Sequence, residues 1–309
     1  MTLMLNKIAK GVVATAFAAV LSTGLQATEG GGGAYPNGSE GFMAGAVPPP
    51  GLYYLNYLTN YSADALMDNN GNEVGDFKLN ATANVSRFVY TSPYKIFGGY
   101  WGAQLIIPLV TLDAKLSINP GPGTVLDGSD TGLGDIVVDP FLVSWHSKNW
   151  HQAVGVDIIL PTGSYSTPSA TNIGPSIGRN YYTFEPLYAV TYISDEGWEV
   201  SSKIMYDFNR ENSDTNYKSG EEFHFDYTVG KHINKDWTVG VGGYYYKQIT
   251  DDEQNGATIA NNKGQVIAVG PQVQYNYGKL SLIAKYHIET NVKNRPKGNK
   301  AWFKLIYPL

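Results

Sequence analysis

The chain has 309 residues, no Cys and a formal net charge of −5, and only 16% of its residues are charged, against about 25% in ordinary soluble domains. The missing Cys excludes a disulfide scaffold, a thiol nucleophile and a thiolate metal site. The acidic balance argues against nucleic acid as a partner, because phosphate binding needs a clustered basic surface.

Residues 1–27 have the pattern of a secretory signal peptide. Lys7 and Lys10 form the positive region, Gly11 to Leu21 is an apolar run, and Leu25-Gln26-Ala27 fits a cleavage site. The apolar run is shorter than the roughly 20 residues that a membrane-spanning helix needs. No later run is long enough either, so a membrane protein is possible only as a β-barrel.

Residues 28–51 form a segment rich in Gly and Pro, with four consecutive Gly from Gly30 and three consecutive Pro from Pro48. Such composition has no usable periodicity. It fits a flexible periplasmic tail or a plug folded into a lumen, and the tail is the simpler interpretation.

From Leu52 to Leu309 apolar and polar residues alternate, as on strands with one dry and one wet face. The predicted strands cover 52–61, 76–91, 97–116, 132–146, 151–162, 180–193, 197–209, 221–233, 237–250, 264–277, 280–290 and 299–309. Their connections alternate between short turns and long polar loops, the latter including 117–131 and 163–179. This indicates an all-β, antiparallel transmembrane barrel of about twelve strands over residues 52–309, with short periplasmic turns and longer extracellular loops, in a bacterial outer membrane.

Aromatic residues gather near the predicted strand ends, where amphipathic rings prefer the headgroup level of a membrane. The alternative, a secreted β-sandwich or lipocalin-like barrel, lacks both this placement and the alternation of short and long connections. The final strand, with Phe303, Leu305, Tyr307 and Leu309 on one face, is compatible with both.

Several strings in order along the chain support the barrel. They are TGLGDIVVDP from Thr131 to Pro140, PTGSY from Pro161 to Tyr165, and GRNYYTFEP from Gly178 to Pro186. Together with Tyr206–Asn209 and 215–226, they resemble the meta-pathway phenol-degradation family of outer-membrane barrels, from about Pro50 onward. The resemblance implies transport of aromatic compounds, and it carries no catalytic or binding residues to transfer.

No set of residues indicates an enzyme, and we expect no catalytic, cofactor-binding or metal site. The sequence from Gly174 through Ser176 to Gly178 matches a nucleophile elbow, but that motif needs a strand before it and a helix after it. A loop precedes it here and a Tyr-rich strand follows, so a turn in a surface loop is the better interpretation.

If the apolar strand faces meet lipid, the opposite faces line a lumen. That set comprises Asp135, Asp157, Tyr181, Glu185, Glu199, Lys203, Asp207, Glu222, His224, Asp226, Tyr244, Tyr246, Lys285, His287 and Glu289. By the same alternation Lys78, Ile106 and Phe141 also point inward. A mixed lining of rings and charges suits small amphipathic solutes better than bulk salts.

Counting residues back from the predicted loop and turn places Lys203 opposite Asp226 on one neighbouring strand and near Glu185 on the other. We expect these three residues to form a charge-paired network with a structural role. Two kinds of residue interrupt the strands. Gly240, Gly242 and Gly243 mark a kink or a place where another group approaches closely. Pro108, Pro140, Pro161, Pro186 and Pro271 remove ladder hydrogen bonds, which favours bulges over a wall that opens sideways.

The function predicted from these features is passage of small hydrophobic or aromatic compounds across the outer membrane. The alternatives are a narrow, weakly cation-selective porin and a structural or adhesive barrel with a filled lumen. The expected partners are outer-membrane lipid, lipopolysaccharide and the solutes themselves, and the barrel is expected to be a monomer.

Overall fold

The computed structural model of the chain describes residues 28–118, 123–167 and 174–309. The predicted signal peptide, residues 1–27, lies outside the described residues. No helix within these ranges is long and apolar enough to cross a membrane.

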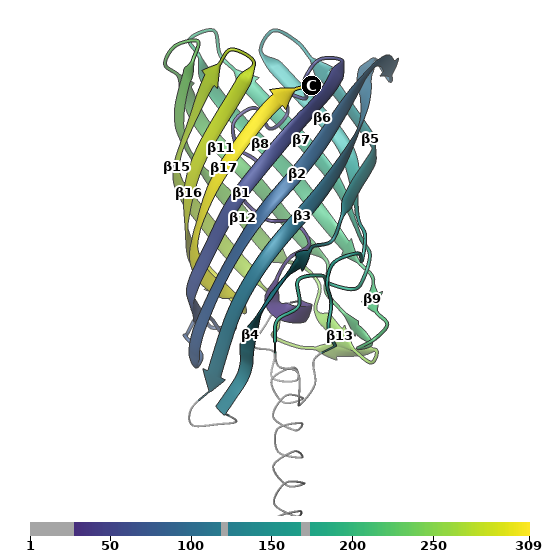
Figure 1. Cartoon of the computed structure of the whole chain (residues 1–309), viewed down its shortest axis with the longest axis vertical. Helices are drawn as coiled ribbons and strands as arrows, with labels where there is room; N and C mark the ends of the chain where they lie inside the picture. The colour runs from purple at the N-terminus through teal and green to yellow at the C-terminus, as the bar shows by residue number, and fades with distance from the viewer. Residues whose placement is uncertain (1–27, 119–122, 168–173) are drawn as a thin grey trace, which may run out of the picture.

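Twelve strands, each antiparallel to its neighbours, close into a barrel (Figure 1), which confirms the predicted fold class. The first strand pairs with the last along its whole length, from Tyr53↔Pro308 to Leu66↔Pro296. The strands of the ring are β1 (Gly51–Leu66), β2 (Asp76–Ile96), β3 (Gly99–Ile118), β5 (Val137–His146), β6 (Trp150–Ile159), β7 (Thr183–Ile193), β8 (Trp198–Asn209), β11 (Glu222–His232), β12 (Trp237–Gln248), β15 (Gln265–Tyr277), β16 (Leu280–Lys293) and β17 (Pro296–Pro308).

The two ends of the barrel differ. Short turns, such as those at Gly98 and Gly278, join strands at the end that also holds the C-terminus (Figure 1). Longer connections at the other end fold into a small sheet of β9 (Glu211–Asn212), β10 (Tyr217–Lys218), β13 (Asp252–Gln254) and β14 (Ala257–Ile259). By the rule for outer-membrane barrels, the short-turn end is periplasmic and the long-loop end extracellular.

The outer face is apolar around the strands between these ends. The exposed side chains there include Leu58, Val200, Phe208, Val229, Val241, Val269 and Ile288. Exposed rings surround the short-turn end, as expected at a lipid headgroup level. They are Tyr94, Phe97, Trp150, Trp198, Trp237 and Tyr277.

A strand that sequence analysis missed branches from the barrel. The segment 117–131 was predicted to be a loop, and this is wrong, because β4 (Gly123–Leu133) pairs with the long-loop half of β3. The periplasmic half of β3 pairs with β5 instead, and Pro108 lies where β3 changes partner. Within the described residues no strand pairs with the other edge of β4, and Ser164 donates a backbone hydrogen bond to Leu133 beside it.

The long-loop end of β2 inverts the predicted polarity, whereas on β3 Ile106 lines the interior as predicted. Lys78 was expected inside, but it is exposed, whereas its neighbours Phe77 and Leu79 turn inward. Asn60 donates hydrogen bonds to Asn80 and Thr82 on this outer surface. The physical reason is that the outside is wet here, so the dry face of each strand is the inner one.

The prolines act in different ways. The ladders of β3 with β5 and of β5 with β6 shift register around Pro140, as a bulge does. This shift puts Phe141 outside, 41% exposed, against its predicted place in the lumen. The β7–β8 ladder beside Pro186 and the β15–β16 ladder beside Pro271 have the same register before and after the proline. Each ladder lacks only the residue pairs next to the proline itself.

Candidate channel interior

Residues 28–50, which we name the lumen segment, run through the inside of the barrel. The segment begins with the 3-10 turn η1 (Glu29–Gly31) at the long-loop end, where the Glu29 N–H donates to Ser219 Oγ (Figure 1). It ends at the short-turn end, where the Gly45 N–H donates to Thr191 Oγ1 and β1 begins. The polar backbone of this segment therefore finds its partners on inward side chains of the barrel wall.

Two oppositely charged residues bind the middle of the lumen segment. The Asp226 carboxylate accepts hydrogen bonds from the N–H groups of Gly38 at 2.7 Å and Glu40 at 2.9 Å. The Lys285 ammonium donates to the carbonyl oxygens of Gly38, Ser39 and Glu40, at 2.6 to 2.9 Å. Charged groups make the stronger hydrogen bonds in a dry interior, so these contacts fix residues 38–40 firmly.

Glu40 adds a side-chain anchor on the opposite wall. Its carboxylate pairs with Lys304 at 2.6 Å and with Arg87, and it accepts a hydrogen bond from the Tyr57 hydroxyl. Burial alone would raise the pKa of Glu40, but the charges of Lys304, Arg87 and then Lys203 outweigh it and hold that pKa well below its usual range. The ionised form is therefore the docked form.

Phe42 explains two of the mid-strand glycines. Its ring is 2% exposed and lies against β11 and β12. A Cβ placed at Gly230 would come within 2.4 Å of the ring, and one at Gly240 within 3.0 Å. The glycines therefore make room for a side chain of the lumen segment, which is the close approach that Gly240 suggested.

The structure places fourteen of the fifteen predicted lumen residues at buried positions, and Asp135 is half-buried. Asp135 accepts hydrogen bonds from the N–H groups of Gly163 and Arg179. Two further groups form around buried carboxylates, and the second of them holds the lumen segment at Met43. Tyr244 donates to Glu289, while Met43 N–H, Ser201 and His232 surround Glu199.

The predicted network around Lys203 has the expected register but different partners. Lys203 stands opposite Asp226 in the ladder and pairs with Glu185 at 3.5 Å. Its nearest carboxylate is Asp157, at 3.2 Å, and not Asp226, which the lumen segment occupies. The sequence could not place the segment, and so it could not anticipate this exchange.

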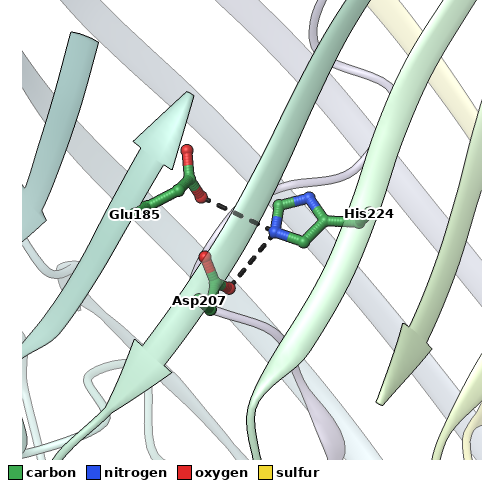
Figure 2. A group of neighbouring side chains, drawn as sticks. All are labelled: Glu185, Asp207 and His224. Carbon is green, nitrogen blue, oxygen red and sulfur yellow. Dashed lines mark ion pairs between the residues drawn. The ribbon is translucent and has the colours of Figure 1, made fainter. Parts of the chain in front are cut away.

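Glu185, Asp207 and His224 meet on three neighbouring strands, β7, β8 and β11 (Figure 2). His224 Nε2 lies 3.2 Å from Asp207 Oδ2 and 3.7 Å from Glu185 Oε2. Each of the three side chains is at most 1% exposed.

A cavity of about 570 Å³ lies between the lumen segment and one wall of the barrel. Its wall is apolar along the inner faces of β2 and β3. The lining there comprises Phe77, Leu79, Ala81, Ala83, Val85, Ile106, Val110, Leu112, Ala114 and Leu116. The cavity is thus two-sided, with an apolar wall on β2 and β3 and charged side chains elsewhere in its lining, such as Arg87, Glu185 and Lys203.

Ser176, from the elbow-like string, belongs to a loop. Its hydroxyl donates to the Ser166 carbonyl oxygen and accepts from the Ser166 N–H. No strand–turn–helix is found around it in the described residues, as the loop interpretation predicts.

Together the fold and interior define a bacterial outer-membrane β-barrel whose lumen holds an N-terminal segment. The family model described as "Putative MetA-pathway of phenol degradation" matches residues 63–305, and the chain belongs to this family. This confirms the family resemblance seen in the sequence.

One solved structure has the same fold, and a second is less similar. An outer-membrane channel from Pseudomonas putida F1 is 16% identical, with a TM-score of 0.73 over 85% of this chain and 97% of that one. The β domain of the Bordetella autotransporter BrkA is 10% identical, with a TM-score of 0.47 over 84% and 100% of the two chains. The search of curated proteins found no match.

Proposed function

We propose that this barrel passes small hydrophobic compounds, aromatic ones included, across the outer membrane. The observation that carries the proposal is the dry cavity beside the β2 and β3 wall. Its volume of about 570 Å³ falls in the range of small-ligand sites, about 300–1,000 Å³. An uncharged ring packs readily on this apolar wall, whereas an ion finds no partner there to replace its hydration.

The filled lumen supports this choice over a general porin. The lumen segment crosses the barrel interior, and its charged anchors on β2, β11, β16 and β17 are paired with it. A straight aqueous path for salts therefore has to displace the segment. We expect the intact protein to conduct ions poorly while it admits neutral solutes.

The route out of the cavity is proposed to pass the free edge of β4. Parting the wall elsewhere breaks the hydrogen-bonded ladders of the ring, whereas across this edge β4 faces the described parts of the following connection, residues 160–167 and 174–182. Pro175 and Ile177 of that connection line the cavity. Moving them would open the dry space toward the membrane without unpairing a strand.

The test compares two substitutions on β3. Val110 lines the cavity and Thr111 is exposed on the outer face. Val110→Asp introduces a charge into the dry space and is expected to lower toluene uptake by cells at limiting concentration, whereas Thr111→Asp leaves uptake near that of the unaltered protein. Equal uptake by both variants at matched barrel levels would refute the proposal.

A further inference from the structure

We propose that Glu185, Asp207 and His224 form a binding site for one divalent transition-metal ion, with Zn²⁺ as the probe (Figure 2). The residues come from β7, β8 and β11, and their ligand atoms all lie within 4.8 Å of one another. Two carboxylate oxygens and one imidazole nitrogen are ligand types that Zn²⁺ accepts, with three protein ligands and an open fourth position.

The spacing fits a shared ion. Bonds of about 2.1 Å in a tetrahedral site put neighbouring ligand atoms about 3.4 Å apart. His224 Nε2 lies 3.2 Å from Asp207 Oδ2 and 3.7 Å from Glu185 Oε2, on either side of that value. The ladder of β8 with β11 and the register of β7 with β8 hold these atoms on a stiff wall, so little reorganisation is needed.

The ligand atoms lack hydrogen-bond partners among the described residues. Within the described chain, both oxygens of Glu185, both oxygens of Asp207 and both ring nitrogens of His224 lack a hydrogen-bond partner, although all three residues are at most 1% exposed. The 3.2 Å approach of His224 to Asp207 therefore lacks the alignment of a hydrogen bond. Buried polar atoms without partners are costly, and a coordinated ion would satisfy one atom of each residue.

The local charge also favours a cation. Lys203 is the basic group near Glu185, but it is shared with Asp157, which lies closer to it. Within the described residues the ion-pair partner of Asp207 is His224, and a neutral imidazole supplies no charge. A divalent ion would balance the two carboxylates.

Packing and access complete the site. The rings of Tyr35 and Tyr246 lie 5.3 and 6.3 Å from the His224 ring and hold its orientation. Glu185 lines the cavity, so an ion can arrive from the interior and keep a water ligand there.

The experiment uses the full mature chain, refolded in detergent and stripped with a chelator. The exposed turn carries His146 and His151, whose Nδ1 atoms lie 3.0 Å apart and could bind Zn²⁺ themselves. Titrations with ZnCl₂ are therefore made in a His146→Gln background. We expect one Zn²⁺ per chain by calorimetry, and CoCl₂ should produce a visible d–d absorption band from mixed nitrogen and oxygen ligands.

Variants then locate the ion. His224→Gln and Asp207→Asn are expected to weaken Zn²⁺ binding by about tenfold or more. His287→Gln and Glu289→Gln, which alter a buried histidine and a buried carboxylate outside the cluster, should bind Zn²⁺ like the background protein.

Binding of no Zn²⁺ by the folded background protein would overturn the proposal, and so would equal binding by His224→Gln. If the variants fail to fold, the Co²⁺ spectrum of the background protein decides, and absence of the band rejects the site. In that case a proton shared between the two carboxyls replaces the metal.

Discussion

Asp226 and Lys285 hold the same stretch of the lumen segment, Asp226 through the N–H groups of two of its residues and Lys285 through the carbonyl oxygens of all three. Residues 38–40 would otherwise carry unpaired backbone groups in a closed interior. Docking at this point depends on main-chain atoms, so most side chains of the segment can vary without loosening it. The exceptions are the side chains that reach the opposite wall, Glu40 above all.

Glu40→Gln is expected to loosen the lumen segment. It leaves Lys304 and Arg87 buried without their carboxylate, and breaking a buried pair in this way costs about 3–5 kcal/mol. Single-channel recordings in planar bilayers should show larger and more frequent openings than those of the unaltered protein. Glu289→Gln is the control, because Glu289 bonds to Tyr61 and Tyr244 of the barrel and not to the segment.

Acid should release the segment, but only well below neutral pH. The pKa of Glu40 is depressed by Lys304, Arg87 and Lys203 against the effect of burial. Its contribution is therefore complete above the usual value of 4.5 and is lost as pH falls through the lower, folded-state pKa. Conductance should stay flat from about pH 8 to pH 5 and rise below about pH 4. A rise between neutral pH and pH 5 would contradict this.

Gly230→Val should expel Phe42. Even a single Cβ at Gly230 approaches the Phe42 ring within 2.4 Å, and β11 cannot yield without breaking its ladders. The expected phenotype is the increased conductance that Phe42→Ala produces, with the barrel still folded. If the conductance of the Gly230→Val protein stays as low as that of the unaltered protein, the lumen segment accommodates the Phe42 ring in another way.

A disulfide tests movement beside β4. A Cβ at Gly132 would lie 3.3 Å from the Ser164 Cβ, close to the roughly 3.5–4.5 Å that disulfides span. Because the chain has no other Cys, Gly132→Cys with Ser164→Cys yields one defined cross-link. We expect oxidation to reduce toluene uptake and reductant to restore it, while each single variant is insensitive. If oxidation leaves toluene uptake unchanged, the solutes do not leave the cavity beside β4.

N-terminal sequencing of protein from outer membranes should begin at Thr28. Cleavage after Ala27 would turn the Thr28 nitrogen into an ammonium group, and that nitrogen lies 3.2 Å from Asp252 Oδ2. Asp252→Asn should then lower the melting temperature of the barrel more than Asp251→Asn does, since Asp251 pairs only with the exposed Lys263. A mature chain starting at another residue would contradict the predicted cleavage.

The strands could be predicted because the alternation of apolar and polar residues is visible within each short stretch of sequence. The pairing of Lys203 opposite Asp226 followed from counting along one hairpin, and it is confirmed. Contacts made by the lumen segment could not be found this way, because Gly38 and Asp226 are joined across the barrel by a segment without periodicity. The signal that the sequence did offer was the glycines at 230 and 240, whose missing side chains leave room for another group against the inner wall of the barrel.

The direction in which β2 faces was predicted wrongly for another reason. Alternation says that Phe77 and Lys78 face opposite ways but not which way is inside. Lipid was assumed to surround the whole strand, whereas the long-loop end carries polar ladders such as Asn60 with Asn80. The cavity was missed with it, since the β2 part of its lining, including Phe77 and Leu79, was assigned to the outer surface. The Glu185, Asp207 and His224 cluster was missed because its members come from three strands.

The lumen segment precedes β1, the strand that seals the barrel against β17. Closing this seam encloses the segment in the same event that completes the hydrogen-bonded ring. Threading it afterwards would draw the Glu40 carboxylate past the finished interior without its partners. Insertion of the lumen segment is therefore a step of barrel assembly. A mutation that weakens the binding of the segment should slow or impair the folding of the barrel in the membrane before it changes transport.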